Sequence, residues 1–155
     1  SLTPISFVRS FSALVNGGYK IKPSIIKGEM TQKEKILDIV ISKEINNLLF
    51  NVVESGTGQQ AKVNKLRIGG KTGTARKIKN GIYSQDVITS FVGVFPAEKP
   101  KFLVFVLFDE PKSENNSYNF YGGNTAAPVF SKIVSRIYPI LKLENTLTHN
   151  SLRDN

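Results

Sequence analysis

Two apolar runs that follow each other closely constrain the fold of this chain more than any other feature. Val87–Phe95 reads VITSFVGVF and Phe102–Phe108 reads FLVFVLF, and their β-branched and aromatic residues are typical of strands. The segment PAEKP, which begins at Pro96, predicts a short turn, so we expect the two strands to form an antiparallel hairpin. Because the second run contains no polar residue, we expect it to be buried on both faces.

Helical periodicity marks three further segments, and a third strand is expected around Leu66–Thr74. The first expected helix is residues 4–15, with Thr3 as N-cap, Pro4 in the first turn and Asn16-Gly17-Gly18 as the stop. The second is Lys43–Glu54, capped by Ser42. The last begins at Asn124 or Thr125 and is bent or ended by Pro139. Tyr19–Ile41 has a mixed pattern that predicts short strands or irregular structure.

Together these elements predict an α/β protein of the α+β type, with an antiparallel sheet flanked by helices. We expect this unit to span residues 1–143 and residues 144–155 to form a flexible polar tail.

Composition excludes several kinds of chemistry. The 155 residues include no cysteine, which rules out disulfides, thiolate metal sites and a cysteine nucleophile, and the one histidine is His149 in the polar tail. We therefore expect no Ser–His–Asp triad, no multi-histidine metal site and no cofactor. The net charge of +9 fits nucleic acid, anionic lipid or another anionic polymer without choosing among them.

The stretch Gly69-Gly70-Lys71-Thr72-Gly73-Thr74-Ala75 carries the strongest chemical signal. Its Gly-Lys-Thr matches the end of a phosphate-binding P-loop, but Lys65 occupies the place of that motif's first glycine, and Asn80-Gly81 predicts a turn instead of the required helix. The alternative is the Lys-Thr-Gly strand of serine acyltransferases that act on penicillin-like or D-alanyl substrates. On such a strand an ammonium group and hydroxyls meet a carboxylate, and a glycine lets the substrate lie against the backbone.

Over residues 1–141 the sequence resembles the C-terminal part of class B penicillin-binding proteins. The resemblance is carried by GKTGTARK, by VVESGTGQQAKV before it and by TSFVGVFPAEKPKFLVFVLFDEP after it, with SLTPISFVRSFSALVNGGYKIKPSIIK and NTAAPVFSKI towards the two ends. It implies a β-lactamase/transpeptidase-like fold, to which this chain contributes three contiguous strands and the closing helix. Asp109-Glu110-Pro111, with TSF before the long apolar strand, looks most like the division-specific septal transpeptidases.

The resemblance implies a role for each residue of the motif. Lys71 would support the acyl-transfer site electrostatically, and the hydroxyls of Thr72 and Thr74 would bind the carboxylate of a terminal D-alanine or of a β-lactam. Gly73 would let the substrate approach the strand, and the backbone N–H of Thr74 would donate to the oxyanion. Gly56-Thr57-Gly58 matches a turn of the family that shapes the cleft floor, although it also fits a helix C-cap.

Two further motifs of the family, Ser-x-x-Lys with the nucleophile and Ser-x-Asn, are expected to lie before residue 1. Ser24-Ile25-Ile26-Lys27, Ser113-Glu114-Asn115 and Ser117-Tyr118-Asn119 match these strings, but about one match to each string is expected by chance. Ser24 follows a proline in an extended stretch, and the other two matches come after the Lys-Thr-Gly motif. We therefore expect the chain to be a piece of a longer protein that is inactive by itself.

The resemblance implies that the parent is a serine D,D-transpeptidase that cross-links peptidoglycan stem peptides during septum formation. Its partners would be D-Ala-D-Ala stem peptides, β-lactams and other cell-division proteins, with an anchor in the inner membrane and this domain on the periplasmic side. A D-alanyl carboxypeptidase or a β-lactamase is an alternative with the same chemistry. A basic module that binds anions or nucleic acid is an alternative of another class, but the aromatic-plus-basic pattern of RNA-binding sheets is missing, so we expect no nucleic-acid partner.

Some features have weaker interpretations. Strands of the parent would cover one edge of Phe102–Phe108, so we expect that edge to be exposed here and the chain to self-associate through it. Tyr83 and Tyr121 are candidates for the border of a substrate groove. Asp109 and Glu110 are candidates for a metal or acid/base pair, although a solvated turn explains them better.

Overall fold

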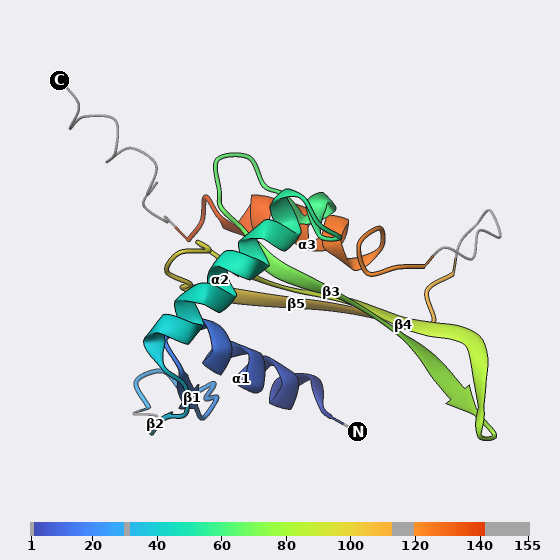
Figure 1. Ribbon diagram of the computed structural model, residues 1–155, viewed down its shortest axis with the longest axis horizontal. Helices are drawn as coiled ribbons and strands as arrows, with labels where there is room; N and C mark the ends of the chain where they lie inside the picture. Colours follow the sequence, from blue (N-terminus) through green and yellow to red (C-terminus); the bar gives the residue numbers. More distant parts are fainter. Residues whose placement is uncertain (1, 30–31, 113–119, 142–155) are drawn as a thin grey trace.

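Figure 1 shows the computed structural model, which describes residues 2–29, 32–112 and 120–141. The elements are α1 (Pro4–Val15), β1 (Tyr19–Ile21), β2 (Lys33–Lys35), α2 (Ile39–Glu54), the short 3-10 helix η1 (Gln59–Ala61), β3 (Gly69–Lys79), β4 (Ile82–Phe95), β5 (Phe102–Asp109) and α3 (Ala126–Ile137). They confirm the α+β class, with an antiparallel sheet and flanking helices. The proposed polar tail, residues 144–155, lies outside the described residues.

The main sheet has the strand order β3-β4-β5, and both pairs are antiparallel. The hairpin predicted from the two apolar runs is therefore confirmed. β3 and β4 meet at Asn80-Gly81, where φ is 52° and 78°, as a two-residue hairpin turn requires. This hairpin extends well beyond the helices (Figure 1).

β3 differs from the predicted strand Leu66–Thr74 at both ends. Lys65 has a φ of 60°, and Leu66 pairs back with Val63 in a tight turn, so the strand begins only at Gly69. It then continues to Lys79, because it remains paired with β4 up to the hairpin turn. β1 and β2 form a separate two-stranded hairpin, which agrees with the short strands expected between Tyr19 and Ile41.

Helices cover both faces of the sheet. On one face, Phe130 of α3 contacts Phe91 of β4, with ring centroids 4.9 Å apart, in a buried apolar cluster. On the other face, Val94 of β4 packs with residues of α1 and α2. Successive side chains of β4 therefore point to opposite faces of the sheet, and both faces are apolar because helices pack on both of them.

β5 is half-buried, and the expectation that it is buried on both faces was wrong. Within β5, Val106 is the only buried residue, and Leu107 is 44% exposed. Both faces do carry contacts, since Phe105 lies against Phe7 of α1 at 4.9 Å and Phe102 belongs to the cluster beneath α3. β5 is an edge strand of the described sheet, however, so its side chains have a strand neighbour on one side only.

The start of α2 also differs from the prediction. The helix begins at Ile39 instead of Lys43, and its N-cap is Asp38, whose side chain accepts a hydrogen bond from Val40 N (2.8 Å). Ser42, the predicted cap, lies inside the helix. By contrast, the Thr3 cap of α1 and the start of α3 after Thr125 are confirmed.

Ser42 instead joins α2 to the end of α1. Its side chain is 1% exposed, and its hydroxyl donates to Leu14 O (2.7 Å) and accepts from Gly17 N (3.0 Å). One turn later, Asn46 Nδ2 donates to Val15 O (3.1 Å). These contacts satisfy backbone groups that the end of α1 leaves without helical partners, so a polar residue is required where the sequence alone indicated a cap.

We expect Ser42→Ala to lower the free energy of unfolding by about 1–3 kcal/mol, because Leu14 O and Gly17 N would lose their partner away from water. Urea unfolding followed by circular dichroism measures the change. Ser10→Ala, on the exposed side of α1, is the matched control and should shift stability by less than about 0.5 kcal/mol. Equal effects of the two substitutions would show that the Ser42 contacts do not stabilise the fold.

Candidate active site at the edge of the sheet

Lys71, Thr72, Gly73 and Thr74 lie in the first half of β3, which is an edge strand of the described sheet. Lys71 Nζ donates to Thr72 O (2.9 Å) and lies 3.5 Å from Thr72 Oγ1. The Thr72 carbonyl is therefore turned away from β4 and towards the open edge. The ammonium group brings a positive charge to the same place.

The pairing of β4 with β5 supports this orientation independently. Glu110 N donates to Val87 O (3.0 Å), and successive residues of a central antiparallel strand bond alternately to their two neighbours. Ser90 of β4, three residues further on, therefore bonds to β3, where its partner is Gly73. The residues on either side of Gly73 must then direct their backbone N–H and C=O groups to the open edge. The N–H of Thr74 is thus available to a ligand.

Glycines keep the surroundings of the motif clear of side chains. A Cβ at Gly70 would lie 2.4 Å from Phe91 Cζ, and one at Gly73 would lie 2.5 Å from Ser90 Oγ. Both distances are shorter than real contacts, so neither position accepts a side chain without movement. The requirement for glycine here comes from close packing.

Two turns from other parts of the chain close over this region. Gly122 N, before α3, donates to Thr74 Oγ1 (3.1 Å), and Thr57 Oγ1, after α2, lies 2.9 Å from Thr72 Oγ1. A Cβ at Gly123 would lie 2.6 Å from Thr57 O, so the two turns also touch each other. Sequence reasoning missed Gly122-Gly123, although two consecutive glycines just before a helix were a usable signal.

The arrangement is chemically suited to an anion. Two hydroxyls, outward-facing backbone N–H groups and one ammonium group lie along a single strand edge, which is a donor set that matches a carboxylate. Thr72 is half-buried, while Lys71 and Thr74 are exposed, so a ligand can reach the edge.

The carboxylates after β5 have another role. Lys77 Nζ binds Glu110 Oε1 (2.8 Å) and Asp109 Oδ1 (2.9 Å), and these hydrogen bonds raise the pKa of Lys77 above its ordinary value. The neighbouring Lys79–Asp86 ion pair likewise lowers the pKa of Asp86. Asp109 and Glu110 are thus ion-pair partners of β3. In residues 2–29, 32–112 and 120–141, no group of three or more His, Asp or Glu side chains could hold a metal.

The other sequence candidates lie at different places. Ser24 is in the exposed loop after β1, where no helix begins, and its hydroxyl hydrogen-bonds to Glu29. Tyr121 is exposed beside Gly122, close to the motif, whereas Tyr83 lies near the far tip of the β3–β4 hairpin. The matches at Ser113-Glu114-Asn115 and Ser117-Tyr118-Asn119 lie outside the described residues, as does His149.

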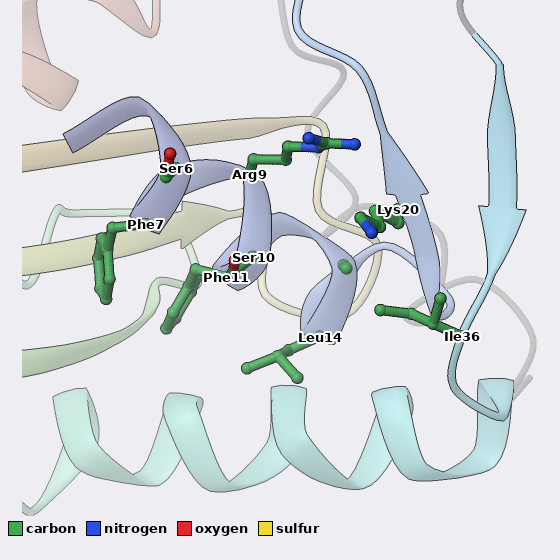
Figure 2. A pocket seen from close by; sticks show the side chains of 9 residues that line it. Ser6, Phe7, Arg9, Ser10, Phe11, Leu14, Lys20 and Ile36 are labelled. Atoms are coloured by element: carbon green, nitrogen blue, oxygen red, sulfur yellow. The ribbon is translucent and has the colours of Figure 1, made fainter. Parts of the chain in front are cut away.

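A groove of about 530 Å³ runs along α1, away from the motif. Figure 2 shows Phe7, Phe11 and Leu14 on its apolar side, with Arg9 and Lys20 close by. None of the four motif residues lines it. This groove is therefore separate from the candidate site at the edge of β3.

Comparisons with known proteins agree with this arrangement. Residues 1–135 match the family model described as "Penicillin binding protein transpeptidase domain". The chain is 38% identical to "Stage V sporulation protein D" of Bacillus subtilis (strain 168), over 91% of this chain and 23% of that protein. It is 35% identical to "Probable peptidoglycan D,D-transpeptidase FtsI" of Caulobacter vibrioides, over 91% and 26%. The TP domain of Burkholderia pseudomallei penicillin-binding protein 3 matches with a TM-score of 0.79 and 27% identity, over 94% of this chain and 44% of that one.

The fold and the sequence together define a penicillin-binding transpeptidase domain of class B. This chain belongs to that family, and it corresponds to part of the domain. It spans about a quarter of the length of the curated relatives that it matches. In the part of the chain that the structure describes, no helix is both long and apolar enough to cross a bilayer.

We expect Gly122→Ala to displace the turn before α3, because its Cβ would lie 2.3 Å from Ser90 O and 2.7 Å from Gly73 O. The displacement should break the hydrogen bond to Thr74 and lower stability by about 1–3 kcal/mol. Thermal unfolding measures the second effect, and the chemical shifts of Thr74, the acceptor of the hydrogen bond, report the first. Tyr121→Ala, in the same turn but exposed, is the control; unchanged Thr74 shifts in Gly122→Ala would contradict the predicted displacement.

Proposed function

We propose that this chain supplies the substrate-binding strand of a serine D,D-transpeptidase that cross-links peptidoglycan stem peptides. The observation that carries the proposal is the open edge of β3, where Lys71, Thr72 and Thr74 present an ammonium group, two hydroxyls and backbone donors side by side. The names of several relatives, such as the D,D-transpeptidase of Caulobacter vibrioides, support it.

In this proposal, the hydroxyls of Thr72 and Thr74 donate to the carboxylate of the terminal D-alanine, and Lys71 stabilises the anion electrostatically. The N–H of Thr74 donates to the oxyanion that forms when the peptide carbonyl is attacked. One preorganised donor of this kind contributes about 2.7–4 kcal/mol of transition-state stabilisation. Ser24, in the exposed loop between β1 and β2, is assigned no role in this proposal.

The reaction uses a serine from another part of the parent protein. Its oxygen attacks the carbonyl of the D-Ala–D-Ala bond, the amide C–N bond breaks, and D-alanine leaves with the serine proton on its amine. The resulting ester is attacked by the amine of a second stem peptide, which forms the cross-link and returns the proton to the serine. A β-lactam would form the same kind of ester with the serine.

The cellular setting is also part of the proposal. A role at the septum, together with other cell-division proteins, rests on the resemblance of Asp109-Glu110-Pro111, and of TSF before the long apolar strand, to the division-specific septal transpeptidases. Such a transpeptidase would be anchored in the inner membrane, with this domain on the periplasmic side, where its peptidoglycan substrate is found.

The experiment uses the full-length gene product that contains these residues. We expect a fluorescent penicillin to form one covalent adduct per protein, and Lys71→Ala or Thr74→Val to slow this acylation about 10- to 100-fold, because each removes a charge-assisted contact. Lys99→Ala, in the turn between β4 and β5, is a matched control that should not change the rate. Unchanged acylation in both site variants would contradict the proposed roles.

The products separate the alternatives within this chemistry. Stem peptides should release D-alanine and form dimers; D-alanine without dimers would indicate a carboxypeptidase, and rapid turnover of penicillin a β-lactamase. The 155-residue chain alone should keep its unmodified mass, and an adduct on Ser24 would contradict the interpretation of Ser24-Ile25-Ile26-Lys27 as a chance match. Steeply salt-dependent binding to DNA would favour the basic-module alternative.

We also propose that the isolated chain self-associates through β5. Backbone hydrogen bonds alternate in direction along an antiparallel strand, and Glu110 bonds to Val87 of β4. The backbone groups of Leu103, Phe105 and Leu107 are therefore directed at the outer edge of the described sheet. An apolar edge of this kind favours pairing with a second strand. Light scattering should detect a dimer or larger species, and Leu107→Lys should shift it towards monomer. A strict monomer of the unmodified chain at high concentration would contradict this proposal.

A further inference from the structure

Thr57 is a polar side chain that contacts the motif directly and whose role the proposed function leaves open. It lies in the turn after α2, and its Oγ1 is 2.9 Å from Thr72 Oγ1. This contact joins residues 15 positions apart in the sequence.

Packing holds Thr57 in this place. Gly56 N and Gly58 N both donate to Val52 O, at 3.1 Å and 3.0 Å, so the turn closes on the last turn of α2. A Cβ at Gly56 would lie 2.9 Å from Val52 O, and one at Gly58 would lie 3.2 Å from Phe91 Cε2. The two glycines thus allow the turn to press against the helix and the core, and they present the threonine between them to β3.

The chemistry of hydroxyl groups assigns a direction to the contact. Thr72 Oγ1 carries one proton and two lone pairs, and a carboxylate ligand can only accept hydrogen bonds. When Thr72 donates its one proton to such a ligand, its contact with Thr57 persists only if Thr57 is the donor. Lys71 Nζ, 3.5 Å from Thr72 Oγ1, is a second donor to this oxygen.

We propose that Thr57 is a positioning residue that donates to Thr72 and so points the Thr72 hydroxyl at the substrate carboxylate. The inference rests on the proposed function and adds a residue outside the Lys-Thr-Gly strand to its site. Hydrogen bonds in such a chain polarise one another, so the donation from Thr57 also strengthens the bond that Thr72 makes to the ligand.

The test is a double-mutant cycle in the full-length gene product, with acylation by a penicillin as the readout. Thr57→Val keeps the shape of the side chain but removes the hydroxyl, and it should slow second-order acylation about 3- to 10-fold, mostly through weaker binding. Thr57→Ser should restore the rate. In a Thr72→Val background, Thr57→Val should cause no further loss, because its effect passes through the Thr72 hydroxyl.

A penicillin methyl ester, which lacks the free carboxylate, provides the second readout, and thermal unfolding confirms that each variant is folded. Thr57→Val should not change the rate measured with the ester. Full rate of Thr57→Val with the free acid, losses that simply add in the double mutant, or an equal loss with the ester would overturn the inference. A wild-type protein that no penicillin acylates would instead overturn the proposed function itself, and the two failures are thereby distinguished.

Discussion

Phe91 and Phe130 pack edge to face with ring centroids 4.9 Å apart, and the neighbouring strand positions must be glycines to leave room for the two rings. A Cβ at Gly93 would lie 2.5 Å from Phe130 Cζ, and one at Gly70 would lie 2.4 Å from Phe91 Cζ. The two glycines let α3 approach the sheet closely, and buried aromatic surface holds it there. Because the turn before α3 is attached to that helix, the same contact brings the turn's backbone to Thr74.

The candidate site then depends on which backbone groups of β3 are hydrogen-bonded to β4 and which are left free to bind a ligand. β4 bonds to β5 through one set of residues and to β3 through the other, so the two threonines of the motif are left facing outward. In the proposed function, a ligand would occupy the position of a further strand, and the hydroxyls and the ammonium group would favour one that ends in an anion. The turns that carry Thr57 and Gly122 hold these hydroxyls from both sides.

Features that depend on neighbours in the sequence were predicted well. Thr3 and Pro4 begin α1, the PAEKP turn joins β4 to β5, and the Lys-Thr-Gly motif lies on an exposed strand, because each is decided within a few residues. Predictions that required knowledge of distant contacts failed. Ser42 has the chemistry of a cap, but the end of α1 uses its hydroxyl. The apolar composition of β5 indicated burial on two faces, yet the helices leave Leu107 44% exposed.

The amino-acid sequence by itself determined the class of fold and placed the four candidate residues on one strand, because periodicity, turn chemistry and a short motif are local properties. The family followed from the resemblance of longer segments to its members. Only the tertiary structure decided that Thr57 and Gly122 meet Thr72 and Thr74. Those contacts join segments separated by 15 and 48 positions, and their distances depend on how two helices settle on one sheet. No local pattern encodes that packing, since it is set by the volumes of buried side chains and by the places where a glycine leaves room.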